Sequence, residues 1–310
     1  MSTARRRHVC LKKKHQRNNS HFLKIIVPLL FISFLLVLLI FKPKIWSGKE
    51  LTTVAVNKSE SDISLLIFDP VEGEITNIII PTITQVSVAG ELGSWKLGSV
   101  WQLGLNEKMG GSLLSRTITK NFSFPTVAWA DSQAYGFFEG GAISLLKATF
   151  AIYKTNLTLG DRVRMALFTL RVQKSARDSF NIKDAGFLKK TKLVGGEEGY
   201  TVFGQIPEKL SAYFNIRNVS EKDLVARITD ATERANISER VGKVIEVMGI
   251  KVGAITKEEG RDTTCVVMGK NKQLVKRLSL VFDCSVIVVN DDIGNFDIDI
   301  VLGKKFVEKF

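Results

Sequence analysis

One apolar run near the N-terminus constrains this chain of 310 residues more than any other feature. Residues Ile25 to Phe41 carry no charge, and the hydrophobic stretch extends back to Phe22, interrupted only by Lys24. Roughly twenty mostly apolar residues are what an α-helix needs to cross about 30 Å of hydrocarbon. The sequence therefore predicts a single transmembrane helix over residues 22–41.

The segment before this run is basic and contains no acidic residue. Because positively charged flanks stay on the cytoplasmic side, residues 1–21 are predicted to be a cytoplasmic tail. The rest of the chain would then lie outside the plasma membrane, as a single-pass protein. A cleaved signal peptide is the alternative, but the run exceeds a typical signal core and no small-x-small cleavage site follows it, which favours an uncleaved anchor.

The positive charge is concentrated near this predicted anchor. The chain carries a net charge of +13, but residues 1–44 hold ten Lys or Arg and no Asp or Glu. The remainder holds 34 Lys or Arg against 31 Asp or Glu. This distribution is not typical of a nucleic-acid-binding domain, so no nucleic-acid partner is expected. The partner predicted for the tail is the lipid bilayer itself.

Histidine and cysteine are scarce in the predicted outer region. All three histidines (His8, His15 and His21) precede the apolar run, and no Cys/His spacing indicates a zinc site, so no cofactor is expected. Cys265 and Cys284 would both lie outside, where oxidation is permitted, in or near adjacent predicted strands. A disulfide between them and two buried free thiols are both open.

The outer region is predicted to hold two α/β domains. Residues 42–60 resemble a stalk, residues 61–205 form the first domain, 206–222 a linker and 223–310 a small second domain. In the first domain a strand over 63–68 and a partner over 74–81 predict a hairpin. In the second, strands over 224–228, 250–255, 263–268, 285–289 and 298–302 alternate with helices over 237–248 and 273–282. This alternation predicts helices packed on a small sheet.

The second domain resembles a known module. The chain ends in a segment with the following residues: Asp299, Ile300, Val301, Leu302, Gly303 and Phe306. This ending and the order of elements over 223–310 resemble the C-terminal domain attached to the LytR–CpsA–Psr envelope proteins. The opening departs from that module, because Thr229 to Glu233 replaces its usual Asn-Gly turn.

Residues before this module resemble, more faintly, the catalytic domain of the same family. Ser61 to Leu66 resembles the family's Ser-Asp-Thr strand, and Ile80 to Thr84 stands where the family has Ile-Pro-Arg-Asp-Thr. The resemblance implies transfer of a glycopolymer from a polyprenyl-pyrophosphate carrier to peptidoglycan, with arginines and Mg²⁺ holding the pyrophosphate. Fixed cations are needed there to meet the charge of a phosphoryl group in transfer. Here Thr82-Ile83 replaces Arg-Asp, which implies a degenerate domain.

We therefore expect a membrane-anchored envelope protein that binds or scaffolds near the cell wall, with no catalytic residues. Its partner would be a cell-wall glycan or a polyprenyl-linked glycan. The alternative is a divergent Mg²⁺-dependent phosphotransferase, with Asp62 as metal ligand and Arg162, Arg164 and Arg171 holding phosphate. The plainer interpretation is that Asp62 caps a strand and that the arginines form the solvated face of a helix over 161–174. Transcriptional regulation fits poorly, since the predicted folded mass lies outside the cell.

Overall fold

The structure is a computed structural model that describes residues 43–310, except 59–61, 194, 217–218, 220–222 and 290–293. The predicted tail (1–21) and transmembrane helix (22–41) lie outside the described residues. Within the described part, every helix is too short or too polar to cross a membrane. The described chain is a mixed α/β protein with three sheets, which confirms the predicted fold class at that level.

A five-stranded sheet forms the centre of the first domain, with strand order β6-β1-β2-β3-β7. Strands β1 (Thr52–Asn57), β2 (Asp62–Asp69) and β3 (Glu74–Pro81) are antiparallel. The predicted hairpin is therefore confirmed. Strands β6 (Ala128–Asp131) and β7 (Arg177–Asn181) run parallel to β1 and β3 at the two edges.

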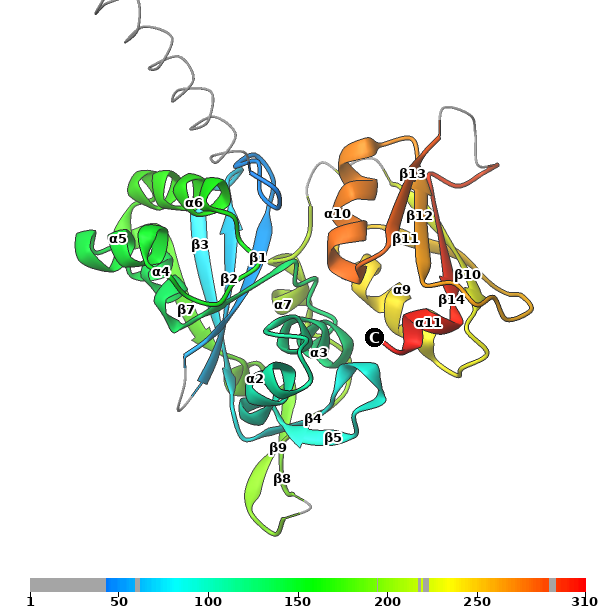
Figure 1. Ribbon diagram of the computed structural model, residues 1–310, viewed down its shortest axis with the longest axis horizontal. Helices are drawn as coiled ribbons and strands as arrows, with labels where there is room; N and C mark the ends of the chain where they lie inside the picture. The colour runs from blue at the N-terminus through cyan, green and yellow to red at the C-terminus, as the bar shows by residue number, and fades with distance from the viewer. Residues whose placement is uncertain (1–42, 59–61, 194, 217–218, 220–222, 290–293) are drawn as a thin grey trace, which may run out of the picture.

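Helices cover both faces of this sheet (Figure 1). Alternating residues of the buried strands point to opposite faces, so Val54 and Val56 join one core while Ala55 joins the other. One face packs against α4 (Gly136–Glu139), α5 (Ala142–Phe150) and α6 (Leu159–Arg171). The other packs against α2 (Leu97–Asn106) and α3 (Ser112–Phe122). The result is a three-layer sandwich.

A smaller four-stranded sheet extends the first domain, in the order β5-β4-β9-β8. Its strands are β4 (Thr84–Ser87), β5 (Ser94–Lys96), β8 (Leu188–Lys192) and β9 (Glu198–Val202). Short 3₁₀ segments connect elements of the domain: η1 (Ala89–Glu91), η2 (Ser132–Tyr135), η3 (Lys174–Ala176) and η4 (Ile182–Ala185).

The C-terminal domain has a five-stranded sheet in the order β11-β10-β14-β12-β13. Its strands are β10 (Val225–Ala231), β11 (Lys251–Lys257), β12 (Cys265–Gly269), β13 (Ser285–Val288) and β14 (Ile298–Gly303). Helices α9 (Ile237–Val247) and α10 (Lys272–Phe282) bury their apolar residues against the sheet, and α11 (Lys304–Val307) follows β14. The predicted alternation is therefore correct, with boundaries shifted by at most three residues.

The predicted stalk over 42–60 is wrong. Residues 52–57 form β1, which lies between β6 and β2, and Trp46 is only 2% exposed. Trp46 packs on Phe68 of β2, with ring centroids 5.7 Å apart. The polar residues around 47–50 suggested a stalk, but the strand that follows is buried on both faces. The first domain therefore includes residues 44–57 rather than beginning at 61.

The predicted linker over 206–222 is also wrong over its first half. It contains α7 (Glu208–Ala212), whose Leu210 is buried. Phe214 stacks on Phe124 with ring centroids 4.7 Å apart. These apolar residues attach the segment to the core that α3 covers.

Candidate anion pocket between the domains

The structure separates the residues of the predicted phosphotransferase site. Asp62 is the first residue of β2 and pairs with Pro81, beside Thr82-Ile83. The N-terminus of α6 lies near Phe68, toward the other end of the same strand, because Asp161 binds the backbone of Trp46 and Trp46 packs on Phe68. Given the rise of a strand, roughly 20 Å separates the two ends. Asp62 is thus not brought to Arg162 or Arg164, which lie in the first turns of α6.

Two of these arginines interact with backbone carbonyl groups of neighbouring loops. Arg162 donates from Nη1 to the carbonyl of Ala151 at 2.8 Å and lies 5.1 Å from the centre of the Tyr153 ring. Burial raises the pKa of Tyr153 to about 12, although Arg162 acts against this shift. Arg164 donates to the carbonyl of Ser47 at 2.7 Å, and Arg171 is exposed. Arg162 and Arg164 thus connect loops to α6.

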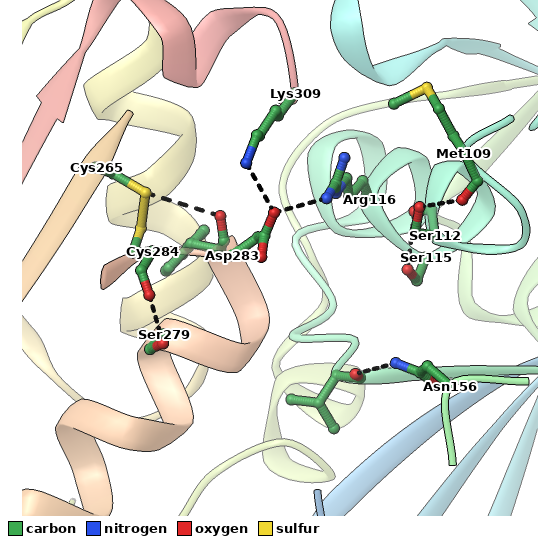
Figure 2. A network of polar contacts seen from close by, with 12 residues as sticks. Met109, Ser112, Ser115, Arg116, Asn156, Cys265, Ser279, Asp283, Cys284 and Lys309 are labelled. Carbon is green, nitrogen blue, oxygen red and sulfur yellow. Dashed lines mark hydrogen bonds and ion pairs between the residues drawn. A yellow bond between two sulfur atoms is a disulfide. The ribbon is translucent and has the colours of Figure 1, made fainter. Parts of the chain in front are cut away.

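Cys265 and Cys284 are joined in a disulfide, with their Cα atoms 4.9 Å apart (Figure 2). It connects β12 to the residue before β13. Between α10 and Cys284, Asp283 forms ion pairs with Arg116 of α3 at 2.8 Å and with Lys309 at 3.0 Å. The C-terminal domain is therefore linked by a charged contact to the first domain.

A cavity of about 150 Å³ lies where these two domains meet near the start of the described chain. One wall is the segment over residues 43–52, and the other is α10. It is lined by Pro43, Lys44, Ile45, Trp46, Ser47, Glu50, Leu51, Thr52, Val127, Gln273, Lys276, Arg277 and Leu280.

Arg277 is the most unusual residue of this cavity. It is 6% exposed, and its Nε and Nη2 atoms have no hydrogen-bond partner within the described part of the chain. Burial lowers the pKa of Arg277 to about 10, although the carboxylates of Glu50 and Asp69 act in the opposite direction. A guanidinium with unused donors in a lined cavity is suited to a carboxylate or phosphate oxygen.

Glu50 is the acidic group nearest to this guanidinium in the cavity lining. Burial raises the pKa of Glu50, while Arg277 and Lys276 act to lower it. Its carboxylate accepts a hydrogen bond from the side-chain amide of Gln273, and its backbone carbonyl accepts one from Trp46 Nε1 at 2.5 Å. With Lys44 and Lys276 also in the lining, the cavity has more basic than acidic side chains.

A second and larger cavity, of about 500 Å³, opens between α3, α9 and the segment before α7. Its basic residues are Lys120, Arg240 and Lys243, and its acidic residue is Glu246. Burial lowers the pKa of Lys120, as does the neighbouring Arg240. Lys120 donates to the carbonyl of Val88 at 3.3 Å, so this cation has a partner within the protein. Arg277 remains the stronger candidate for an external anion.

Among the described residues, no group of three His, Cys, Asp or Glu is arranged to hold a metal ion. The feature of the cavity that suits an anion is Arg277, whose Nε and Nη2 atoms make no hydrogen bond within the described residues.

The sequence alone missed both Glu50 and Arg277. Glu50 lay in the segment interpreted as a stalk. A signal for Arg277 did exist, since it follows Leu274 by three residues and precedes Leu278 and Val281 on the buried side of α10. A charged residue on an apolar helix face requires a partner or a ligand.

Comparison with known proteins gives only distant similarity. No family model matches the sequence, and no curated protein matches it. Among solved structures, TagV of B. subtilis aligns with 50% of this chain and 92% of its own, at 10% identity and a TM-score of 0.38. TagT of B. subtilis aligns with 52% of this chain and 87% of its own, at 12% identity and a TM-score of 0.35.

Two further structures are similar to the same degree. One is TagT, described as a LytR-CPS2A-psr family protein with bound octaprenyl pyrophosphate lipid (53% of this chain, 88% of its own, 13% identity, TM-score 0.36). The other is a transcriptional regulator from Enterococcus faecalis (65% of this chain, 89% of its own, 10% identity, TM-score 0.38). Similarity at this level says nothing about the ligand or activity of this chain, so the function is argued from its own residues.

Proposed function

We propose that this chain is a membrane-anchored, extracytoplasmic envelope protein of the LytR–CpsA–Psr type that binds an anionic envelope ligand without transferring it. The observation that carries this proposal is Arg277, a buried guanidinium with two nitrogen atoms that make no hydrogen bond within the described residues. A buried cation of this kind is costly unless a counter-charge approaches it.

The position of the pocket supports an envelope ligand. Its walls include Pro43 and Lys44, two to three residues after the apolar run ends at Phe41. If residues 22–41 span the membrane, the pocket opens close to the bilayer surface. The phosphate of a polyprenyl-linked glycan, or the charged groups of a cell-wall glycan, would be within its reach.

The separation of Asp62 from the arginines of α6 favours binding over catalysis. A metal ligand and phosphate-binding cations must surround one phosphoryl group, but Asp62 and the first turn of α6 lie near opposite ends of β2. Thr82-Ile83, next to Asp62, supplies neither a cation nor a carboxylate. The divergent phosphotransferase is therefore the less favoured candidate.

The test uses the full chain in lipid nanodiscs. Equilibrium binding of a polyprenyl pyrophosphate is measured for the wild type and for Arg277→Met, with Arg171→Met as an exposed-arginine control. We expect binding by the wild type and the control, and a loss of at least about tenfold in Arg277→Met, the loss expected when a charge-assisted hydrogen bond is removed. Turnover of a lipid-linked pyrophosphate donor with Mg²⁺ would contradict the non-catalytic part of the proposal.

A further inference from the structure

Helices α5 and α6 and the loop between them expose an apolar surface. We call this the α5–α6 apolar face. It consists of Ile143, Leu146, Phe150, Ile152, Leu167 and Leu170. Ile152 is fully exposed, and the exposed fractions of the other five range from 51% to 71%.

These residues share one outer surface. The opposite sides of the two helices bury Leu145, Ala148, Met165 and Ala166 in the core over the sheet. The two helices also pack against each other. Their exposed sides therefore look away from the sheet together. Single exposed hydrophobic residues are ordinary, but a group of this size on adjacent helices indicates an interaction surface.

A buried carboxylate fixes where the N-terminal segment meets this layer. Asp161 Oδ1 accepts hydrogen bonds from the backbone N–H groups of Lys44, Ile45 and Trp46, at 3.0, 3.0 and 2.9 Å. Its other oxygen accepts from the backbone and the hydroxyl of Thr158 at the start of α6. Residues 44–46 are thus held against the first turn of α6.

This attachment places α6 close to any membrane that residues 22–41 span. Only two residues lie between Phe41 and Lys44, and they reach at most about 10 Å when extended. Figure 1 shows α6, with α5 beside it, at the end of the first domain where the blue start of the coloured chain lies. The α5–α6 apolar face is therefore near the plane of the headgroups rather than at the far side of the domain.

The charges around the face fit a lipid surface. Between residues 142 and 174 there are six Lys or Arg residues, and the one acidic residue, Asp161, is buried. Lys147, Lys154, Arg164 and Arg171 are exposed among the apolar residues. Lys and Arg side chains beside an apolar helix face attract anionic lipid headgroups. An apolar transmembrane segment packed on the same face would offer these cations no group of opposite charge.

We propose that the α5–α6 apolar face inserts into the interfacial layer of the bilayer, so that the first domain lies on the membrane rather than projecting from it. This inference rests on the membrane anchor of the proposed function. It adds a second, monotopic contact that would hold the Arg277 pocket at the lipid surface.

The experiment places an environment-sensitive fluorophore on the full chain. Cys10→Ser removes the cysteine outside the disulfide, and Phe150→Cys then provides one labelling position. Phe203→Cys is the matched control, because Phe203 is 61% exposed against 59% for Phe150 but follows β9 in the second sheet. Each protein is reconstituted in nanodiscs of anionic lipid, with and without doxyl-labelled lipid as a quencher.

We expect the label at position 150 to shift to shorter wavelength and to lose emission with the doxyl lipid, while the label at position 203 does neither. An aqueous spectrum at position 150 would overturn the proposal. A shifted spectrum without quenching would overturn it too, because protein would then cover the face, either residues 22–41 or a second copy. Alkaline extraction distinguishes failure of this proposal from failure of the membrane anchor. A chain that is released from the membrane has no transmembrane anchor. A chain that is retained but carries an aqueous label at position 150 has the anchor, and its α5–α6 apolar face does not insert.

Discussion

At the scale of single residues, two charged side chains lie in surroundings where the sequence pattern predicts apolar side chains. Arg277 lies on the buried side of α10, and Glu50 follows a tryptophan that is itself buried. Their charges partly offset each other across the cavity, as the opposing effects on their pKa values indicate. The Nε and Nη2 atoms of Arg277 still make no hydrogen bond within the described residues, and this guanidinium defines the pocket.

The raised pKa of Glu50 makes a prediction about pH. A carboxyl group whose folded-state pKa exceeds its unfolded value stabilises the fold below the unfolded pKa, and this contribution is lost as pH rises through the folded pKa. Glu50→Gln does not titrate. The stability of the wild type relative to Glu50→Gln should therefore fall as pH rises from about 4.5 through the raised pKa of Glu50. Denaturant unfolding of both proteins across this range measures the difference, and a constant difference would refute the assignment.

At the scale of elements, two local devices position the pocket and its surroundings. The N-terminus of α6 has a capping box between Thr158 and Asp161, and the same carboxylate holds residues 44–46. In the C-terminal domain, the disulfide secures Cys284, which lies between α10 and β13. The first device holds the segment over residues 44–46, and the second follows directly after α10. This segment and this helix are the two walls of the pocket between the domains.

Removing the charge of Asp161 should loosen the segment over residues 44–46. In Asp161→Asn, one oxygen is replaced by a donor that cannot accept from the Thr158 groups, and the remaining oxygen is no longer charged. We expect a loss of about 1–3 kcal/mol in the free energy of unfolding. Asp178→Asn, at an exposed carboxylate, is the control and should change stability by less than about 0.5 kcal/mol. Equal stability of both variants would contradict the role given to Asp161.

Removing the disulfide should destabilise the C-terminal domain. The bond closes a loop with a sequence separation of 19 residues, for which chain entropy predicts about 3 kcal/mol. Cys265→Ser with Cys284→Ser should therefore lower the denaturant midpoint of this domain. Dithiothreitol should lower the midpoint of the wild type to that of the double variant. No effect of the reductant on the wild type would mean that the two thiols are free in the protein.

The sequence predicts some of these elements well. Strand β12 and helices α9 and α10 have clear periodicity, because one face of each element is buried and the other is more exposed. Strand β1 was missed because it follows a polar segment, although its own residues Thr53 to Val56 are almost wholly buried. The capping box at Thr158 and Asp161 has a recognisable Ser/Thr-x-x-Asp/Glu pattern, which could have placed the start of α6.

At the scale of the whole molecule, the pocket depends on how the two domains meet. Glu50 and Arg277 lie far apart in the sequence, and no local pattern indicates that the segment before β1 contacts α10. The separation of Asp62 from Arg162 has the same origin, because it depends on which end of β2 approaches α6. Local periodicity therefore predicted several strands and helices, whereas the candidate site required the tertiary arrangement.

The most direct measurement is the thermal unfolding midpoint of the full chain with and without farnesyl pyrophosphate, a soluble probe that carries the pyrophosphate of a polyprenyl carrier. A ligand that binds only the folded state raises the midpoint, with about 2.7 kcal/mol of stabilisation at one hundred times its dissociation constant. Arg277→Met also removes the attraction between Arg277 and Glu50 and is expected to lower the midpoint without ligand, so each protein's shift is measured against its own ligand-free midpoint. We predict a raised midpoint for the wild type and for Arg171→Met, and none for Arg277→Met. An equal rise in all three proteins, or no rise in the wild type, would contradict the assignment of the anion pocket to Arg277.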